Sequence, residues 1–373
     1  MSPIPKTLYP KGVHFVGSVP CDTTRETLTL LSKNLPDHIR RLPDGEPSNR
    51  QNFIFFQIAL FRPYPELLNA RVNKDTTTSG AALSDQKLRE VRNYLSKLET
   101  GYDTAAIDSY HTFVTMRNEG VIPQGVRFQV SIPTPLNALS AAIAGPHRNL
   151  VEPYYEAAMK RALKNIQTQI PHEDLAIQID CAHEFGLLEE IWRKPEEERF
   201  APWWVGDLDD KQGIFDGVIE RIVRFADQEQ IAANVELGFH FCYGDIGHKH
   251  FVEPKDMGLM VKVAKALLPR LQAEGRKVSW IHMPVPKERD DEAYFEPLRS
   301  LVPILREGQT ECYPGLIRES DEAGTRRRVE TARNVLGDQV AWGAASECGY
   351  GRTPRSQMGS ILEIMKSVAA SVR

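Results

Sequence analysis

Eight short β-prone segments, separated by longer segments with helical periodicity, most limit what this 373-residue chain can fold into. The eight are rich in β-branched or aromatic residues, and the stretches between them repeat apolar residues every three or four positions. Alternating strands and helices build a parallel sheet, and eight such repeats predict an α/β fold of the (β/α)8 (TIM) barrel type. The predicted strands are 13–18, 38–43, 126–132, 175–180, 233–241, 277–283, 310–317 and 339–345.

We expect the whole chain, 1–373, to form this single barrel domain, with its core between about residues 13 and 370. The longest connection, roughly residues 51–124, follows the second strand and predicts a helical insertion before the third. A second long connection, 193–210, is rich in tryptophan, proline and acidic residues and is either a lid or plain surface. The alternative fold is a doubly wound open sheet, but no G-x-G-x-x-G motif follows the first strand.

Composition and charge narrow the range of partners. A formal net charge of −4 argues against nucleic acid or an anionic membrane, which leaves a small-molecule substrate as the expected partner. No segment approaches the roughly 20 apolar residues that span a bilayer, and the N-terminus lacks an apolar secretory core. Five cysteines, an odd and widely spaced set, suit a reducing compartment, so we expect a cytoplasmic protein. A monomer is compatible with this sequence, which sets no oligomeric state.

Chemically active side chains follow nearly every predicted strand. In a (β/α)8 barrel the active site lies at the C-terminal ends of the strands, so these residues should gather at one mouth. We expect a single cavity lined by Ser18, Glu46, Asp180, His240, Cys242, His282 and Cys348. His183, Arg318 and Arg352 follow the fourth, seventh and eighth strands and extend the set.

The stretch 237–251 raises the sharpest chemical question, because it holds three of the ten histidines and one of the five cysteines. Zinc prefers cysteine sulfur and histidine nitrogen, and a catalytic zinc keeps three protein ligands and one exchangeable position. His240 and Cys242 end the fifth strand and form the core of a predicted zinc site. Cys348, at the end of the eighth strand, is the predicted third ligand, and His282 the fourth.

Two other histidines of this stretch, His248 and His250, lie farther along the loop. We expect at most one to face the cavity and neither to bind metal. The alternative for the whole cluster is structural: the cysteines would be small buried hydrophobic residues, and His240 would hydrogen-bond the backbone. Spacing alone leaves both interpretations open.

In this arrangement the chain resembles the C-terminal catalytic barrel of cobalamin-independent methionine synthase, in the superfamily that also holds uroporphyrinogen decarboxylase. The resemblance covers about residues 13–370 and implies the same barrel. It also implies a zinc ion that activates a homocysteine thiol as a thiolate, which takes a methyl group from a folate. It rests on five motifs in the same order: VGSVP (16–20), DGEPSNR (44–50), IQIDCAHEFGL (177–187), HFC (240–242) and ECGYGR (347–352).

The resemblance assigns roles to individual residues. The family's zinc ligands are one histidine, two cysteines and one glutamate, and the matching positions here are His240, Cys242, Cys348 and, in place of glutamate, His282. The family's amino-acid-binding residues correspond to Ser18, Glu46 and Asp180. Two carboxylates opposite a small ligand would hold an α-ammonium group, and a backbone donor near Ser18 would meet its carboxylate.

Besides His282, the chain departs from the family pattern at two further places. Arg318 stands where the family has a histidine acid, and arginine stays protonated and is no ordinary proton shuttle. The folate-stacking tryptophan has no counterpart near PTPLNAL (133–139), so the sequence does not support folate as the methyl donor. We assign candidate catalytic roles to Asp180, His183 and Arg318, and we add Arg352 to the substrate-binding residues.

Three functions are compatible with these residues. The first is zinc-dependent methyl or alkyl transfer to the thiol of a small amino-acid-like acceptor. The second is a lyase or decarboxylase-like reaction, in which the arginines Arg318, Arg352 and Arg355 clamp a carboxylated substrate and His183 or His248 moves protons. The third is a metal-binding barrel without catalysis, because a fold alone does not determine a function.

Overall fold

The computed structural model describes residues 10–244 and 249–373, and these form the predicted (β/α)8 barrel. Within the described residues eight strands pair in parallel, in the order β1-β8-β7-β6-β5-β4-β3-β2. Parallel bridges between Val13 and Ile39 and between Ser18 and Gly45 bring the two end strands together. The strands are β1 (Val13–His14), β2 (Arg41–Pro43), β3 (Arg127–Pro133), β4 (Leu175–Cys181), β5 (Glu236–Phe241), β6 (Trp280–Pro284), β7 (Glu311–Ile317) and β8 (Ala344–Ser346).

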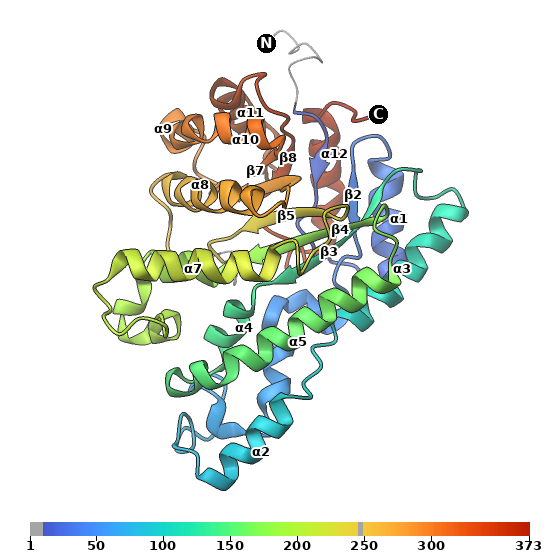
Figure 1. Ribbon diagram of the computed structural model, residues 1–373. Helices are drawn as coiled ribbons and strands as arrows, with labels where there is room; N and C mark the ends of the chain where they lie inside the picture. Colours follow the sequence, from blue (N-terminus) through green and yellow to red (C-terminus); the bar gives the residue numbers. More distant parts are fainter. Residues whose placement is uncertain (1–9, 245–248) are drawn as a thin grey trace.

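The helices pack around the outside of the barrel (Figure 1). Several begin at side chains that accept a backbone N–H of the first turn, which satisfies an otherwise orphaned donor. Thr23 caps α1, Asp210 caps α7 and Asp321 caps α11 in this way. The α-helices are α1 (Thr24–Asn34), α2 (Asp85–Leu95), α3 (Tyr102–Asn118), α4 (Pro135–Ala142), α5 (Arg148–Gln169), α6 (His183–Leu188), α7 (Lys211–Ala226), α8 (Gly258–Ala273), α9 (Glu292–Phe295), α10 (Val302–Gly308), α11 (Glu322–Leu336) and α12 (Met358–Val368).

Successive side chains of each strand point alternately toward the surrounding helices and into the barrel interior. Ala176, on β4, joins Trp280, Tyr313 and Ala345 in a small buried cluster separate from the main core. Gly238 makes room for this layer, because a Cβ at that position would lie 1.9 Å from the Trp280 ring. On β4, β5 and β6 the next inward positions toward the C-terminal ends carry the buried polar side chains of Gln178, His240 and His282.

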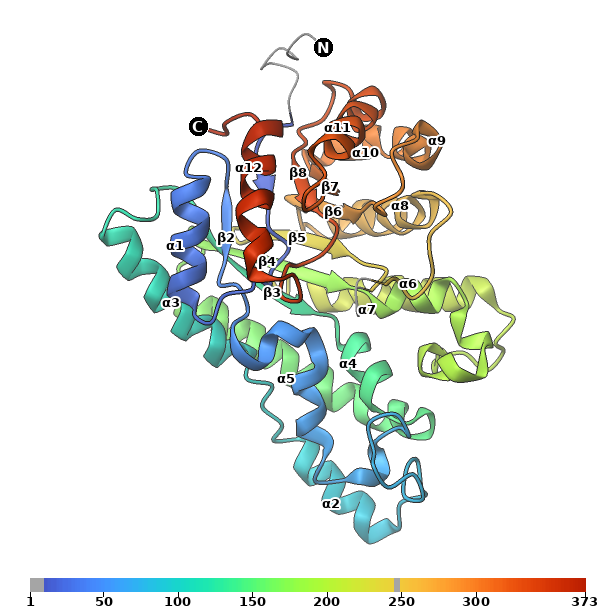
Figure 2. The same ribbon diagram turned by 180° about the vertical axis from the view of Figure 1, so that it is seen from behind.

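The predicted insertion follows β2 and supplies helices before the barrel helix α3. It begins with η2 (Ser48–Phe61) and continues through η3 (Pro65–Leu67) to α2, which lies beyond α5 to one side of the barrel (Figures 1 and 2). Backbone angles at Phe53 (φ 56°, ψ −120°) break η2 into two parts. This break directs the following residues toward the C-terminal mouth.

The long connection after β4 contributes one side chain to the cavity and packs elsewhere against the barrel helices. It contains η5 (Ile191–Arg193) and η6 (Pro195–Phe200), and Arg199 from η6 lines the cavity described below. Trp203, by contrast, donates to Glu152 on α5 and is plain packing. The remaining short helices are η4 (Gly145–His147), η7 (Glu296–Ser300) and η8 (Arg355–Gln357). Across the described residues, no helix combines the length and apolar character needed to cross a bilayer.

Candidate metal centre and ligand cavity

One cavity at the C-terminal ends of the strands receives most of the predicted site residues. It is a partly open cavity, lined by residues from several strand ends and from the loops that follow them. Its predicted members come from the ends of strands that are far apart in the sequence. They are Ser18, Glu46, Asp180, His183, His240, Cys242, Cys348 and Arg352.

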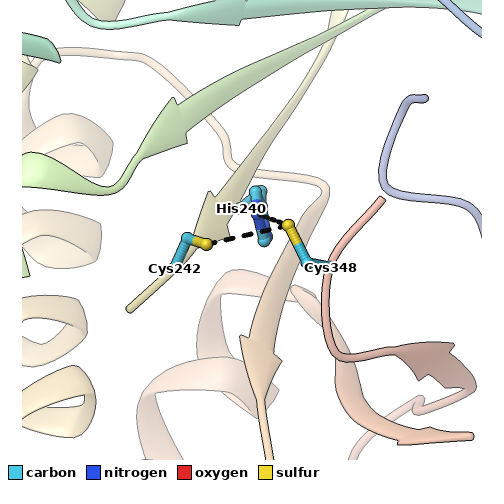
Figure 3. Close-up of side chains that lie close together, drawn as sticks. All are labelled: His240, Cys242 and Cys348. Atoms are coloured by element: carbon cyan, nitrogen blue, oxygen red, sulfur yellow. Dashed lines mark hydrogen bonds between the residues drawn. The ribbon is translucent and has the colours of Figure 1, made fainter. Parts of the chain in front are cut away.

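Three of these side chains form a compact group of nitrogen and sulfur donors. Ligand atoms of His240, Cys242 and Cys348 all lie within 4.8 Å of one another. The two sulfurs are 3.8 Å apart, and the Cys348 sulfur is 3.8 Å from His240 Nε2. Figure 3 shows the two cysteines pointing toward one another beside the His240 ring. This is the convergence that the sequence predicts for these three residues.

Local structure explains why the three donors meet. His240 is the inward residue near the end of β5, and Cys242 follows two positions later on the same side. Cys348 arrives on the turn after β8, which packs closely against Ser18. A Cβ at Gly349 would lie 2.3 Å from the Ser18 hydroxyl oxygen, so a larger residue there would displace the Ser18 side chain.

The donor set fits zinc in both chemistry and spacing. Zinc–sulfur bonds are about 2.3 Å long, so two sulfurs of a tetrahedral site lie about 3.8 Å apart. The Cys242 and Cys348 sulfurs already have that separation. One histidine and two cysteines leave the fourth position for a substrate, as in catalytic rather than structural zinc sites.

His282 was expected to be the fourth ligand, but the structure does not bring it into this group. His282 is the register partner of His240 on the neighbouring strand, so the two rings meet inside the barrel. Its Nδ1 lies 2.7 Å from His240 Nδ1, and its Nε2 lies 2.8 Å from the Ser346 carbonyl oxygen. Both ring nitrogens are thus occupied, and His282 lies behind the donor group.

Arg318 was expected to be a catalytic residue of the cavity, but it is not among the residues that line it. Its guanidinium lies 2.5 Å from a carboxylate oxygen of Glu347 and also donates to the Val285 carbonyl. Glu347 is the neighbour of Cys348, so this buried pair supports the turn that carries the cysteine. A direct catalytic role for Arg318 therefore has no geometric support.

The two histidines farther along the β5 loop have separate outcomes. His250 lies 2.6 Å from Glu347 and 2.9 Å from Glu253, so both of its ring nitrogens face carboxylates. His250 is not among the residues that line the cavity, and whether it binds metal stays a prediction. His248 lies outside the described residues.

The carboxyl groups of Glu46 and Asp180 face the cavity in an environment that disfavours their charge. Burial, followed by the nearby charges of Asp180 and Asp44, raises the pKa of Glu46 to about 8. Burial is also the main cause that raises the pKa of Asp180 to about 7, against a hydrogen bond from Gln178. A bound cation would reverse both shifts, because it favours the charged carboxylates.

His183 lines the cavity as a neutral ring. Burial, followed by the charges of Arg199 and Arg148, lowers the pKa of His183 to about 3. Its Nδ1 lies 2.6 Å from the Ser140 hydroxyl, and its ring centroid is 4.7 Å from that of Phe200. At neutral pH this side chain can orient a ligand, but its low pKa makes it a poor proton shuttle.

Sequence reasoning missed the apolar wall of the cavity. This wall consists of Phe53, Ile54 and Phe55 from the insertion and of Phe251 from the β5 loop. Phe55 is 46% exposed, an unusual state for a large apolar side chain beside a cavity. The apolar run NFIFF (52–56) was the available signal, but its place at the mouth depends on the break at Phe53.

Comparison with known proteins adds a distant likeness in fold. No protein-family model matches the chain, and no curated protein matches it. A solved structure of a B12-independent methionine synthase from Shewanella sp. W3-18-1, in complex with selenomethionine, is similar with a TM-score of 0.45. The two sequences are 12% identical over 73% of this chain, which spans 66% of that protein's length. The chemistry of the site therefore has to be argued from the side chains described above.

Proposed function

We propose that this protein is a zinc-dependent enzyme that transfers a methyl or alkyl group to the thiol of a small amino-acid-like acceptor. One observation carries the proposal. The His240, Cys242 and Cys348 donors share a single cavity with the carboxyl groups of Glu46 and Asp180. A metal that takes a thiol and acids that take an ammonium group are the two contacts such an acceptor requires.

The ligand group supports thiol chemistry through its charge. Two cysteine thiolates and a neutral His240 would balance a divalent ion, and three protein ligands leave one position for the acceptor sulfur. A zinc ion held there would keep that sulfur as a thiolate, which is nucleophilic at neutral pH.

The acidic side of the cavity supports the acceptor's amino group. An ammonium between Glu46 and Asp180 would offset their burial and hold both carboxylates in the charged form. The Ser18 oxygen accepts the Gly351 N–H at 3.1 Å, so its own hydroxyl proton is available to a carboxylate. Arg352 lines the same cavity and adds positive charge.

The arginines do not form the three-membered clamp that the lyase alternative names. Of Arg318, Arg352 and Arg355, Arg352 alone lines the cavity, where Arg199 of η6 also lies. Arg318 faces Glu347, and Arg355 lies on the surface, 3.5 Å from Asp22.

The proposal is tested by acceptor binding to cobalt-substituted protein. A thiol that joins the metal adds a sulfur-to-cobalt absorption band, so homocysteine should intensify this band. The same amino acid with a methyl thioether in place of the thiol should leave it unchanged. Glu46→Gln should weaken the homocysteine response. An unchanged spectrum at saturating homocysteine would contradict thiol binding at the metal.

A further inference from the structure

We infer that His282 is a positioning residue: it fixes the tautomer of His240, so that His240 Nε2 is unprotonated and directed at the metal position. The inference rests on the proposed metal site, but it concerns hydrogen bonds that this chain makes without a metal. His282 would thus act through His240 rather than as a ligand.

The hydrogen-bond chain determines where each proton lies. The Ser346 carbonyl oxygen can only accept, so His282 Nε2, at 2.8 Å, must carry a proton and donate it. A neutral ring has one N–H, which leaves His282 Nδ1 as an acceptor. His240 Nδ1, at 2.7 Å, must then donate to it. The remaining nitrogen of His240, Nε2, keeps its lone pair.

That lone pair is where a metal would require it. His240 Nε2 is the nitrogen that lies 3.8 Å from the Cys348 sulfur, on the side of the donor group. Histidine binds metals through an unprotonated nitrogen, and a hydrogen bond at the other nitrogen selects which one is available. The second nitrogen of a metal-binding histidine usually meets a carboxylate, a carbonyl or water. Here a second imidazole takes that place.

The surroundings of His282 favour a neutral ring, which is the form that can accept a hydrogen bond at Nδ1. The ring is fully buried and hydrogen-bonds a backbone carbonyl and another imidazole, so a positive charge there would be costly. Pairing between β5 and β6 holds the two histidines in register, so the arrangement rests on rigid backbone.

The direct test is the tautomer of His240 in the metal-free protein. Nitrogen-15 spectra of protein labelled at histidine distinguish protonated from unprotonated ring nitrogens, and loss of signals in His240→Gln assigns the ring. We expect a protonated Nδ1 and an unprotonated Nε2 for His240, and the opposite pattern for His282. A metal-free wild-type protein whose His240 is protonated at Nε2 would overturn the inference.

The functional test is zinc affinity, measured by competition with a chelator. His282→Leu removes the acceptor and should weaken zinc binding by about 10- to 100-fold. His282→Asn places a carboxamide oxygen near the former Nδ1 and should recover much of the loss. The matched control is His147→Gln, since His147 is a buried histidine that bonds the Ala81 carbonyl in the insertion. Its zinc affinity should stay at the wild-type value.

The outcomes separate this inference from the proposed function. Folded His282→Leu with wild-type zinc affinity would contradict a positioning role, and so would His282→Asn no better than His282→Leu. If His282→Leu does not fold, the wild-type tautomer still decides the question. Failure of thiols to bind the metal, with the expected tautomer present, would count against the proposed function alone.

Discussion

The two ends of the barrel hold buried charges in opposite ways. At the N-terminal ends of the strands, Arg41 lies 2.5 Å from Glu236, 2.9 Å from Glu311 and 4.2 Å above the Trp280 ring. At the C-terminal ends, burial raises the pKa of both Glu46 and Asp180, and the charge of Asp180 raises the pKa of Glu46 further. The same fold thus pairs its buried charges at one end and, at the other end, buries two carboxyl groups in an environment that disfavours their charged form. The first pattern stabilises the barrel, whereas the second fits a site completed by a ligand.

The largest stability effect should come from the N-terminal end. Arg41→Met removes the buried guanidinium that joins Glu236 and Glu311, which keep Arg127 and Arg40 as partners, and loss of these charged hydrogen bonds should cost about 2 kcal/mol of unfolding free energy. The matched control is Arg25→Met, which removes an exposed pair with Glu119 and should cost less than about 1 kcal/mol. Urea denaturation checks both. Equal losses in the two variants would contradict the claim that this end is the structural one.

At the C-terminal end the same kind of change should weaken ligand binding without loss of stability. Glu46→Gln removes a charge that the fold disfavours, so its unfolding free energy at pH 8 should equal or exceed that of the wild type. Losing one charged hydrogen bond should weaken binding of an amino-acid acceptor by about 10- to 150-fold. Calorimetric titration and urea denaturation measure the two effects. A strongly destabilised Glu46→Gln would indicate that Glu46 stabilises the fold, as Arg41 does, and would contradict this prediction.

The two carboxyl groups at the C-terminal end should also make the free energy of unfolding depend on pH, with a smaller effect than the two substitutions above. The folded pKa values of Glu46 and Asp180, about 8 and about 7, lie above their ordinary values. The folded state therefore binds more protons than the unfolded state between about pH 4 and pH 8, and stability falls as pH rises through that range. The double variant Glu46→Gln, Asp180→Asn should lack this component. Identical pH profiles for the two proteins would refute the assignment.

The sequence predicted the barrel because each strand carried its own apolar pattern. Its least accurate boundaries are those of β1 and β8, where pairing covers only Val13–His14 and Ala344–Ser346. The ends of these two strands are hard to predict, because a strand boundary depends on the hydrogen bonds that neighbouring strands make and not on local propensity alone. Barrel geometry alone brings strand ends together, which is why Cys242 and Cys348 could be paired across the sequence.

The rest of the site depended on contacts that sequence spacing does not contain. An inward position on β6 was evident for His282, but whether its ring reaches the cysteines or stops at His240 is decided by strand register. Arg318 likewise follows its strand as expected, yet Glu347 holds its guanidinium away from the cavity lining. The apolar wall of the cavity requires a backbone break at Phe53, and nothing local in the sequence specifies that conformation.

The central claim is that His240, Cys242 and Cys348 hold one zinc ion, and elemental analysis of the purified protein tests it most directly. The matched control is Cys21→Ser, because Cys21 is also buried but is not among the residues that line the cavity. We predict about one zinc per chain in the wild type and in Cys21→Ser, and its loss in Cys242→Ser and Cys348→Ser. A wild-type protein that stays metal-free after zinc is supplied, or cysteine variants that keep the ion, would contradict the account.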